Sequence, residues 1–367
     1  MKIRTFAKLG DICDVSAGQG APQGDSNYCD NGTPFVKAGN LIELIQGKKE
    51  TEIQKVSEDV AKKHKLKKYP VGSLLFAKSG MSCMKGYVYQ LKNDSYVVSH
   101  LAIVKPKKDS SDYIEYCLRH IKPNSLVKDE AYPSISLQDI SNLEIPLPSL
   151  EEQVKIADQL SKCTQIINKH KEQLEKYDFL IKSRFIEMFG DPIENTKSWI
   201  EEPLGNCCLL KAGKAIKASE LADKDKEHPY PCFGGNGIRG FISKKSHTGK
   251  IVLIGRQGAL CGNVQLTDGD FYATEHAVVT SPKKELNSIW LYHLLFLMDL
   301  NRYKSGAAQP GLTVEKLNTV PTMIVPIELQ NDFAAFVQQI DKSKFAVQKS
   351  LEKAETLYKS LMQEYFG

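Results

Sequence analysis

Two long stretches of the chain repeat apolar residues at alternating steps of four and three. The first covers residues 156–188 and the second covers residues 333–365. This spacing is typical of the a and d positions of a coiled coil, and each stretch exceeds an ordinary globular helix, so each helix needs a long partner. The predicted core positions are Ile156, Leu160, Ile167, Leu174, Tyr177 and Ile181 in the first helix, and Phe333, Val337, Ile340, Val347, Leu351 and Tyr358 in the second.

The flanking residues mark where both helices begin and end. Pro148 and Pro326 precede them, and acidic residues follow in each first turn, where the helix dipole favours negative charge. Gly190 ends the first helix and Gly367 ends the second. We therefore expect spacer helices over residues 149–190 and 326–367.

Both helices belong to a longer internal repeat. The "EMFG" that ends the first helix returns as "EYFG" at an offset of 177 residues, and the same offset joins Glu151 to Glu328. Other matching pairs are "LGDICDVSAG" (9–18) with "LGNCCLLKAG" (204–213), "VGSLLFAKSG" (71–80) with "TGKIVLIGRQG" (248–258), and "VVSHLAIV" (97–104) with "ATEHAVVT" (273–280). A period this long indicates a tandem duplication of domains, because solenoid repeats span about 20–50 residues.

The sequence before each helix shows mixed strands and turns. We therefore predict an α+β fold with two duplicated globular domains, residues 1–148 and 191–325, the second beginning with a linker at 191–199. Each spacer helix would run for about 50 Å at ~1.5 Å per residue. Because the second helix starts beyond the second domain, the two helices should pair antiparallel, with approximate two-fold symmetry. Such symmetry matches that of duplex DNA, in which two modules recognise two half-sites.

Composition narrows the class of protein without deciding the function. The 367 residues carry a net charge of +5, which permits an acidic partner such as nucleic acid but does not require one. No apolar run approaches the ~20 residues of a membrane span, and the N-terminus lacks a signal-peptide pattern. Nine cysteines without a C-x-x-C pair indicate reduced thiols, so we expect a cytoplasmic location and no membrane partner.

No motif in the sequence indicates catalysis. Gly235, Gly237 and Gly240 form G-x-G-x-x-G, but short strands and turns surround it, whereas a dinucleotide site requires a strand before it and a helix after it. "SHTGKI" lacks the upstream glycine of a phosphate-binding loop. Methyltransferase and nuclease motifs are missing too. We expect no catalytic, cofactor-binding or metal-binding residues in this chain.

Two histidines and one basic run allow more than one interpretation. His100 and His276 hold equivalent places in the repeat, each before an apolar strand, and we favour buried structural histidines over a catalytic or metal-binding role. The segment from Lys48 to Lys68 contains eight lysines and four acids. A solvated helix face and a phosphate-contacting edge explain this run equally well.

Glycine-rich turns carry the best candidates for contact with DNA. Arginine and lysine can donate to guanine, and glutamine and asparagine can bond to adenine, although polar turns are also ordinary strand connections. The two copies differ in these turns, which predicts two different half-sites. The candidates are Gln19, Gln23, Asn27, Lys78, Ser79 and Lys85 in the first copy, and Lys214, Lys217, Arg239, Arg256 and Gln257 in the second.

Several segments resemble the specificity subunit of type I restriction–modification enzymes. They are "IPLPSLEEQVKIADQL", "FIEMFGDPIENTKSW", the paired turns "LFAKSG" and "LIGRQG", and "YPCFGGNGIRGF" (230–241). The resemblance implies a bacterial, non-catalytic subunit that binds a bipartite site on double-stranded DNA. It also implies partnership with two methyltransferase (M) subunits and with motor–nuclease (R) subunits. S-adenosylmethionine and ATP would then bind to those partners and not to this chain.

One interpretation from another class remains open. The duplicated domains could bind peptides, and the chain would then be a protein–protein scaffold or adaptor on a coiled-coil spacer. The heptad pattern is the same in both cases, so the sequence pattern alone does not separate them. A fused methyltransferase is excluded because its catalytic motif is missing from the sequence.

Overall fold

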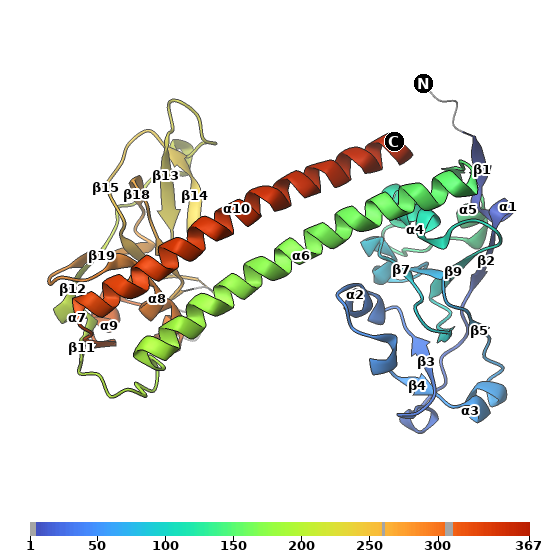
Figure 1. Cartoon of the computed structure of the whole chain (residues 1–367), viewed down its shortest axis with the longest axis horizontal. Coiled ribbons are helices and arrows are strands. Elements are labelled where there is room, and N and C mark those ends of the chain that lie inside the picture. The colour runs from blue at the N-terminus through green and yellow to red at the C-terminus, as the bar shows by residue number, and fades with distance from the viewer. Residues whose placement is uncertain (1–4, 259–260, 305–310) are drawn as a thin grey trace. The chain divides into compact units, whose positions relative to one another are not determined.

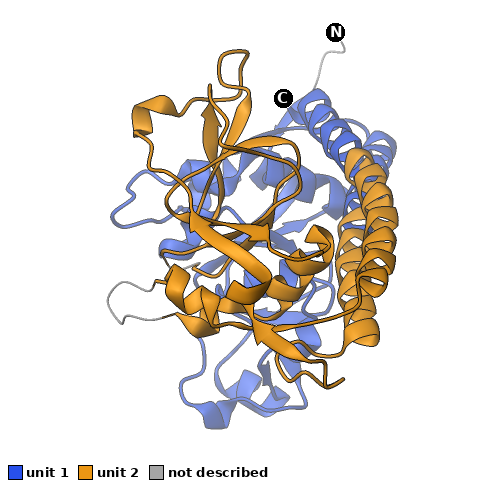
Figure 2. Cartoon of the chain, turned by 90° about the vertical axis from the view of Figure 1, so that its left-hand side faces the viewer, with its two compact units in different colours: residues 1–169, 351–367 blue, residues 170–350 orange. Residues whose placement is uncertain are grey.

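The computed structural model describes residues 5–258, 261–304 and 311–367. They form two compact units (Figure 2). Unit 1 comprises Met1–Lys169 and Leu351–Gly367, and unit 2 comprises His170–Ser350. Each unit therefore contains one globular copy of the repeat together with parts of both long helices, whereas the sequence analysis placed whole helices between the globular domains.

In the described part of unit 1 the chain forms three sheets and five short α-helices (Figure 1). The strands are β1 (Phe6–Lys8), β2 (Cys13–Ala17), β3 (Thr33–Val36), β4 (Lys55–Val56), β5 (Lys68–Tyr69), β6 (Leu74–Ala77), β7 (Val88–Gln90), β8 (Ser95–Val97), β9 (Leu101–Pro106) and β10 (Glu144–Pro146). The helices are α1 (Leu9–Ile12), α2 (Asn40–Ile45), α3 (Glu58–Lys63), α4 (Ser111–Ile121) and α5 (Leu137–Ser141).

Unit 2 has the same kinds of elements. Its strands are β11 (Glu201–Pro203), β12 (Cys208–Ala212), β13 (Tyr230–Gly234), β14 (Gly237–Ile242), β15 (His247–Thr248), β16 (Val252–Gly255), β17 (Val264–Leu266), β18 (Asp270–Ala273), β19 (Ala277–Pro282) and β20 (Pro321–Met323). Its short helices are α7 (Leu204–Cys207), α8 (Ser288–Leu297) and α9 (Val314–Asn318).

The sheets of the two units have the same strand order. The order β2-β9-β6-β7 in unit 1 matches β12-β19-β16-β17 in unit 2, and β4-β3-β8-β5 matches β14-β13-β18-β15. In each second sheet the two central strands are parallel, β3 with β8 and β13 with β18. The predicted α+β class and the duplication are confirmed.

Two helices of 40 residues each, α6 (Leu150–Phe189) and α10 (Ile327–Phe366), each contribute residues to both units. In unit 1 the N-terminal half of α6 contacts the C-terminal end of α10, where the Tyr365 hydroxyl donates to Gln159 Oε1 at 2.6 Å. In unit 2 Lys344 donates to Asp178, and the ring of Phe333 contacts the ring of Phe185. The contacting residue is thus later in α6 when its partner is earlier in α10. The two helices are therefore antiparallel within each unit, as predicted.

The heptad positions form the inner face of these helices. All twelve predicted core positions are buried or half-buried. The structure adds Phe185 and Phe189, which are fully buried and which the heptad count did not include. Their rings lie 5.3 and 5.6 Å from the ring of Phe333, and Phe189 also contacts Trp290. The end of α6 is thus part of the hydrophobic core of unit 2.

Equivalent glutamines fasten the start of each long helix to its own domain. Gln153 and Gln330 occupy the same place in the repeat, and both are almost completely buried. The backbone N–H of Ser110 donates to Gln153 Oε1 at 3.0 Å, and that of Asn287 donates to Gln330 Oε1 at 2.9 Å. Each side-chain amide donates to a backbone carbonyl just before the helix. These bonds satisfy buried groups and fix the direction in which the helix leaves the domain.

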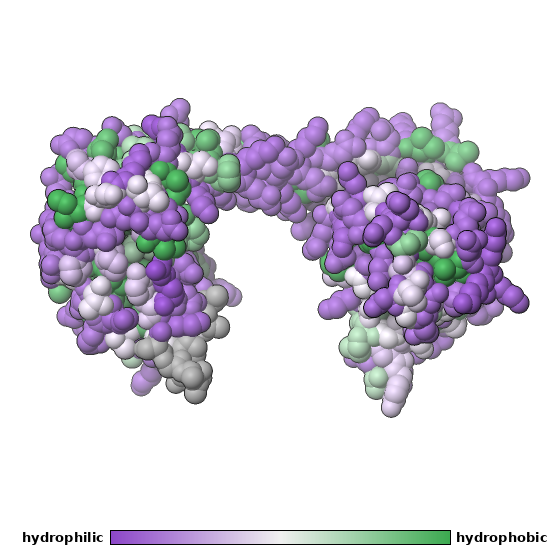
Figure 3. Space-filling view, turned by 90° about the horizontal axis from the view of Figure 1, so that it is seen from below, coloured by the Kyte–Doolittle hydropathy of each residue, from purple (hydrophilic) through white to green (hydrophobic). Residues whose placement is uncertain are grey.

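The outer surface agrees with this assignment of the core. The faces of both units seen in Figure 3 are mostly hydrophilic, with scattered apolar side chains. Across residues 5–258, 261–304 and 311–367, no helix has the length and apolar character required to span a bilayer.

Candidate nucleic-acid interface

In unit 1 four segments meet where β6 ends. The N–H of Lys78 donates to the carbonyl of His100 at 2.9 Å, and the carbonyl of Lys78 accepts from Ile135 at 2.7 Å. The N–H of Ser99 donates to the carbonyl of Gln19 at 2.8 Å. Backbone bonds therefore bring together Gln19, Lys78 and Ser79, which the sequence analysis named as candidates, and add His100.

Unit 2 repeats this arrangement with other side chains. The N–H of Arg256 donates to the carbonyl of His276 at 3.0 Å, and the carbonyl of Arg256 accepts from Leu312 at 2.8 Å. The N–H of Lys214 donates to the carbonyl of Ala273 at 3.1 Å. Lys214 and Arg256 thus hold the positions that Gln19 and Lys78 hold in unit 1.

A glycine in each unit permits this convergence. A Cβ atom on Gly18 would lie 2.2 Å from the carbonyl oxygen of Val98, and one on Gly213 would lie 2.1 Å from that of Ala273. Both distances are shorter than any Cβ contact can be, so the chain passes its neighbour this closely only as glycine. The close passage is shared by both copies and therefore belongs to the common scaffold of the site.

The two histidines lie in different environments. His100 is exposed, and its Nδ1 lies 2.8 Å from the Ser79 hydroxyl. His276 is half-buried, and its Nε2 lies 3.1 Å from Glu275 Oε1. The prediction of buried structural histidines was wrong for His100, because the turn ends one residue before the buried part of β9 begins.

Gln19 has a role that the sequence did not indicate. Its Nε2 donates to the carbonyl of Lys65 at 2.7 Å, and its Oε1 accepts from the N–H of Lys67. Both polar ends of the side chain are therefore engaged, and they hold the end of the lysine-rich run beside the site. That run is not one helix face, since only Glu58–Lys63 within it is α-helical.

The remaining candidates of unit 1 lie in flanking loops. The Gln23 amide donates to Ala21 O at 3.0 Å, and the Asn27 amide donates to Gln23 O at 2.6 Å, so both side chains also stabilise their own loop. Lys85 is exposed at the end of the 3-10 helix Met81–Lys85. Neither Lys78 nor Lys85 forms an ion pair with another described residue, so both charges are available to a ligand.

In unit 2 the other candidates lie on the β13–β14 hairpin and in two loops. Arg239 is exposed on β14, and its stem crosses Gly234, where a Cβ atom would meet Arg239 Cδ at 2.4 Å. Lys217 and Gln257 are exposed in neighbouring turns. Glu275 was not among the functional residues predicted from the sequence. The sequence signal that could have indicated Glu275 is a difference in charge between the two copies, because the first copy has Ser99 at the equivalent position.

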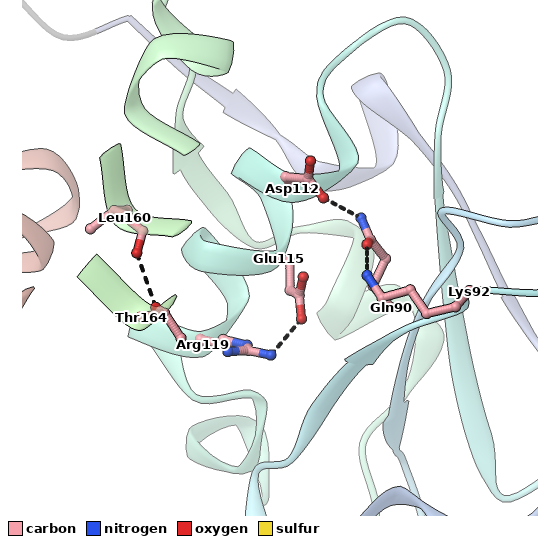
Figure 4. Close-up of polar contacts among 7 residues, drawn as sticks. All are labelled: Gln90, Lys92, Asp112, Glu115, Arg119, Leu160 and Thr164. Atoms are coloured by element: carbon pink, nitrogen blue, oxygen red, sulfur yellow. Dashed lines mark hydrogen bonds and ion pairs between the residues drawn. The ribbon is translucent and has the colours of Figure 1, made fainter. Parts of the chain in front are cut away.

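A groove of about 520 Å³ lies elsewhere in unit 1, between α4, β7 and the N-terminal half of α6. Figure 4 shows that its polar side chains pair with one another: Gln90 donates to Asp112 at 2.7 Å, and Arg119 lies 2.6 Å from Glu115. Burial raises the pKa of Glu115, and the charge of Arg119 opposes that rise. The polar side chains of this groove therefore bond to one another.

The equivalent groove of unit 2, about 610 Å³, has a different chemistry. It lies between α8, β17 and the N-terminal part of α10, and it is lined by Tyr292, His293 and the exposed ring of Phe296. Within the described parts of the chain, no group of three or more histidine, cysteine or acidic side chains could hold a metal ion. The converging turns are therefore the best candidate site in both units.

Comparison with known sequences gives one family. The family described as "Type I restriction modification DNA specificity domain" matches residues 4–176 and 197–355. The EcoprrI specificity subunit of Escherichia coli is 50% identical over 139 residues, which is 38% of this chain and 35% of that protein. A putative specificity subunit of Haemophilus influenzae is 29% identical over 113 residues, 30% of this chain and 29% of its own length. The chain thus spans about a third of the length of these two relatives.

Other relatives match over most of their length. The MjaIX specificity subunit of Methanocaldococcus jannaschii is 28% identical, with 94% of this chain and 88% of that protein covered. Among solved structures, the type I S subunit from M. genitalium has a TM-score of 0.69 at 17% identity, with 100% of this chain and 96% of that one covered. A chain from a structure of type I complex assembly has a TM-score of 0.56 at 16% identity, with 100% and 98% covered. At these identities the structures support the fold.

Proposed function

Because this chain belongs to the type I restriction–modification DNA specificity family, we propose that it is the subunit that recognises the DNA target of such a system. The observation that carries the proposal is the duplicated site. Each unit presents basic and polar side chains on the same backbone scaffold, held by the same hydrogen bonds. The chain itself carries out no chemistry in this proposal.

Each unit recognises one half-site. Lysines at the turns contact phosphates and position the unit, while arginine and polar side chains contact base edges and determine sequence. The planar guanidinium of Arg256 can donate two hydrogen bonds to a guanine, whereas the ammonium group of Lys78 is a point charge suited to a phosphate.

The two half-sites differ in sequence. Unit 1 presents a serine–histidine pair and a lysine, whereas unit 2 presents an arginine beside a glutamate–histidine pair. Side chains with different donors and acceptors select different base edges. The complete target is then bipartite and asymmetric, with an unread gap between its two parts.

Catalysis in this proposal resides in partner subunits. Two methyltransferase subunits dock on the outer faces of α6 and α10 and on the "FGDP" junction, residues 189–192, and motor–nuclease subunits join the complex. The similarity to a chain from a solved type I assembly supports this partnership. S-adenosylmethionine and ATP belong to those partners.

The salt dependence of DNA binding tests this proposal. Binding of labelled duplexes that carry the system's target is measured for the full chain, alone and with its methyltransferase subunits, at several salt concentrations. A protein that contacts 6–10 phosphates loses about 10³- to 10⁵-fold in affinity between 50 and 200 mM salt, and we expect a fall of this kind. An affinity that barely changes with salt would exclude phosphate contact and favour the peptide-binding scaffold.

A further inference from the structure

Unit 2 holds an acidic side chain inside its otherwise basic candidate site. Glu275 precedes β19, directly beside the strand end that carries Arg256. One carboxylate oxygen, Oε1, lies 3.1 Å from His276 Nε2. The equivalent position of unit 1 is Ser99, so the acid is a property of the second unit alone.

Several polar atoms at this place are buried without a hydrogen-bond partner in the described structure. They are Glu275 Oε2, His276 Nδ1 and Arg256 Nε. A buried polar atom without a partner is unfavourable, so a cluster of such atoms calls for a water, an ion or a ligand that completes their bonding. The cluster offers both an acceptor and donors to such a ligand.

The backbone segments around this cluster pack closely against one another. The β13–β14 hairpin rests on the end of β16, and a Cβ atom on Gly255 would lie 1.8 Å from the carbonyl oxygen of Gly235. A Cβ atom on Gly235 would lie 3.2 Å from the carbonyl oxygen of His276. Arg239 belongs to this hairpin, and its stem crosses Gly234, the residue before Gly235.

A carboxylate in a DNA site has a restricted role. Phosphates repel it, so it cannot contribute to backbone contact, and it has no proton to donate to a base acceptor. It can accept a hydrogen bond from an exocyclic amino group, and glutamate pairs in this way with cytosine N4. In the major groove the guanine of the same base pair presents O6 and N7, which an arginine fork recognises.

We propose that Glu275 recognises the amino group of a cytosine in the half-site bound by unit 2, while Arg256 recognises the guanine paired with it or next to it. The contact of Glu275 with His276 orients the carboxylate through Oε1, and binding of DNA must uncover the buried Oε2 before that atom can accept from the base. This inference rests on the proposed function, and it predicts a C·G pair at a position where the half-site of unit 1 has a different requirement.

The test is binding-site selection from randomised duplexes with the full chain assembled with its methyltransferase subunits. Glu275→Gln keeps the size of the side chain but adds an amide donor, which bonds to adenine. We expect the preference for cytosine at one position of one half-site to fall by roughly tenfold or more, with adenine gaining, while the other half-site stays unchanged. Glu285→Gln removes an exposed acid elsewhere in unit 2 and should leave the whole target unchanged.

Arg256→Lys provides a second measurement, because it keeps the charge and loses the fork. It should relax the guanine preference at the paired or adjacent position, and thermal unfolding of both variants checks that unit 2 remains folded. A target that is identical for wild type, Glu275→Gln and Arg256→Lys would overturn the inference. Selection of no sequence by the wild-type complex would instead overturn the proposed function.

Discussion

Lys78 and Arg256 occupy the same backbone position in the two units, yet under the proposed function they offer DNA different chemistry. Each is fixed through its N–H and carbonyl by equivalent hydrogen bonds, so only the side chain varies. The difference between a point charge and a planar fork then decides whether a residue positions the unit or contributes to specificity.

Replacing these two residues by alanine should give different outcomes. Lys78→Ala should weaken binding to all sequences and reduce the salt slope by about one phosphate contact, whereas Arg256→Ala should cost about 1–3 kcal/mol and relax specificity at one position. Binding to target and non-target duplexes at several salt concentrations measures both effects. Lys108→Ala is the control, because this exposed lysine follows the opposite end of β9. Equal loss for all three variants would argue against the assigned site.

His293 links the stability of unit 2 to pH. Burial and, to a smaller extent, the nearby charge of Lys344 lower the pKa of His293 to about 4, and the charge of Asp178 opposes this shift. Since the unfolded value is about 6.5, the unfolded chain takes up a proton first as pH falls, and stability present above pH 6.5 is lost towards pH 4. Between pH 7 and pH 5 this loss should be roughly 2 kcal/mol in wild type and smaller in His293→Gln.

Urea unfolding followed by tryptophan fluorescence measures this loss, because both tryptophans, Trp199 and Trp290, belong to unit 2. His64→Gln, which alters an exposed histidine of unit 1, should keep the full pH dependence. The assignment fails if His293→Gln loses as much stability as wild type over the same pH range.

At the scale of elements, the long helices serve as more than a coiled coil. Their ends are fastened to the globular parts by buried glutamines and, in unit 2, by the aromatic cluster around Phe185 and Phe189. A helix whose end belongs to a domain core cannot rotate without disrupting that core. The direction of each helix is therefore fixed by its own domain.

Gln330→Ala should destabilise unit 2 and leave unit 1 unchanged. The substitution leaves the N–H of Asn287 and the carbonyl of Val325 without their partner, at a cost of about 1–3 kcal/mol. Hydrogen exchange measured peptide by peptide should show the loss of protection in unit 2, and Gln153→Ala should show the same loss in unit 1. Gln339→Ala on the exposed face of α10 is the control. Loss of protection spread evenly over both units would contradict this view.

The elements that the sequence predicted well are those with a local or repeated signal. The heptads gave the inner faces of α6 and α10, and the internal repeat gave the duplicated α+β fold and the shared turns. Phe185 and Phe189 were missed because they contact the domain core from outside the heptad face. The bond between Gln19 and Lys65 joins residues 46 positions apart, and no local pattern encodes it.

The candidate site was predictable in part for the same reason. Lys78 and Arg256 stand out because the repeat aligns their turns. The exposure of His100 depends on where the turn ends relative to β9, which one apolar strand pattern does not specify. The assignment of Glu275 depends on the buried polar atoms beside it in the fold. The sequence shows the acidic residue but not these neighbours, and so it did not indicate a ligand.

For the whole molecule, the proposed function assigns one recognition site to each copy of the duplicated domain. Because each unit has its own core and its own site, changes in one unit should alter one half-site only. Gly213→Ala should abolish recognition of one half-site, since a Cβ there would lie 2.1 Å from a backbone oxygen, and Gly18→Ala should do the same for the other half. Selection experiments with each variant test this independence, and it is contradicted if either substitution changes both half-sites alike.

The most direct test of the central claim is sequencing of modified adenines in cells that carry the complete system, with and without this chain. The account predicts a motif of two different short half-sites separated by a constant unread gap, and this motif should disappear when the chain is removed. A continuous or perfectly palindromic motif, or one that persists without the chain, would contradict the claim that two different units of this chain recognise the two halves.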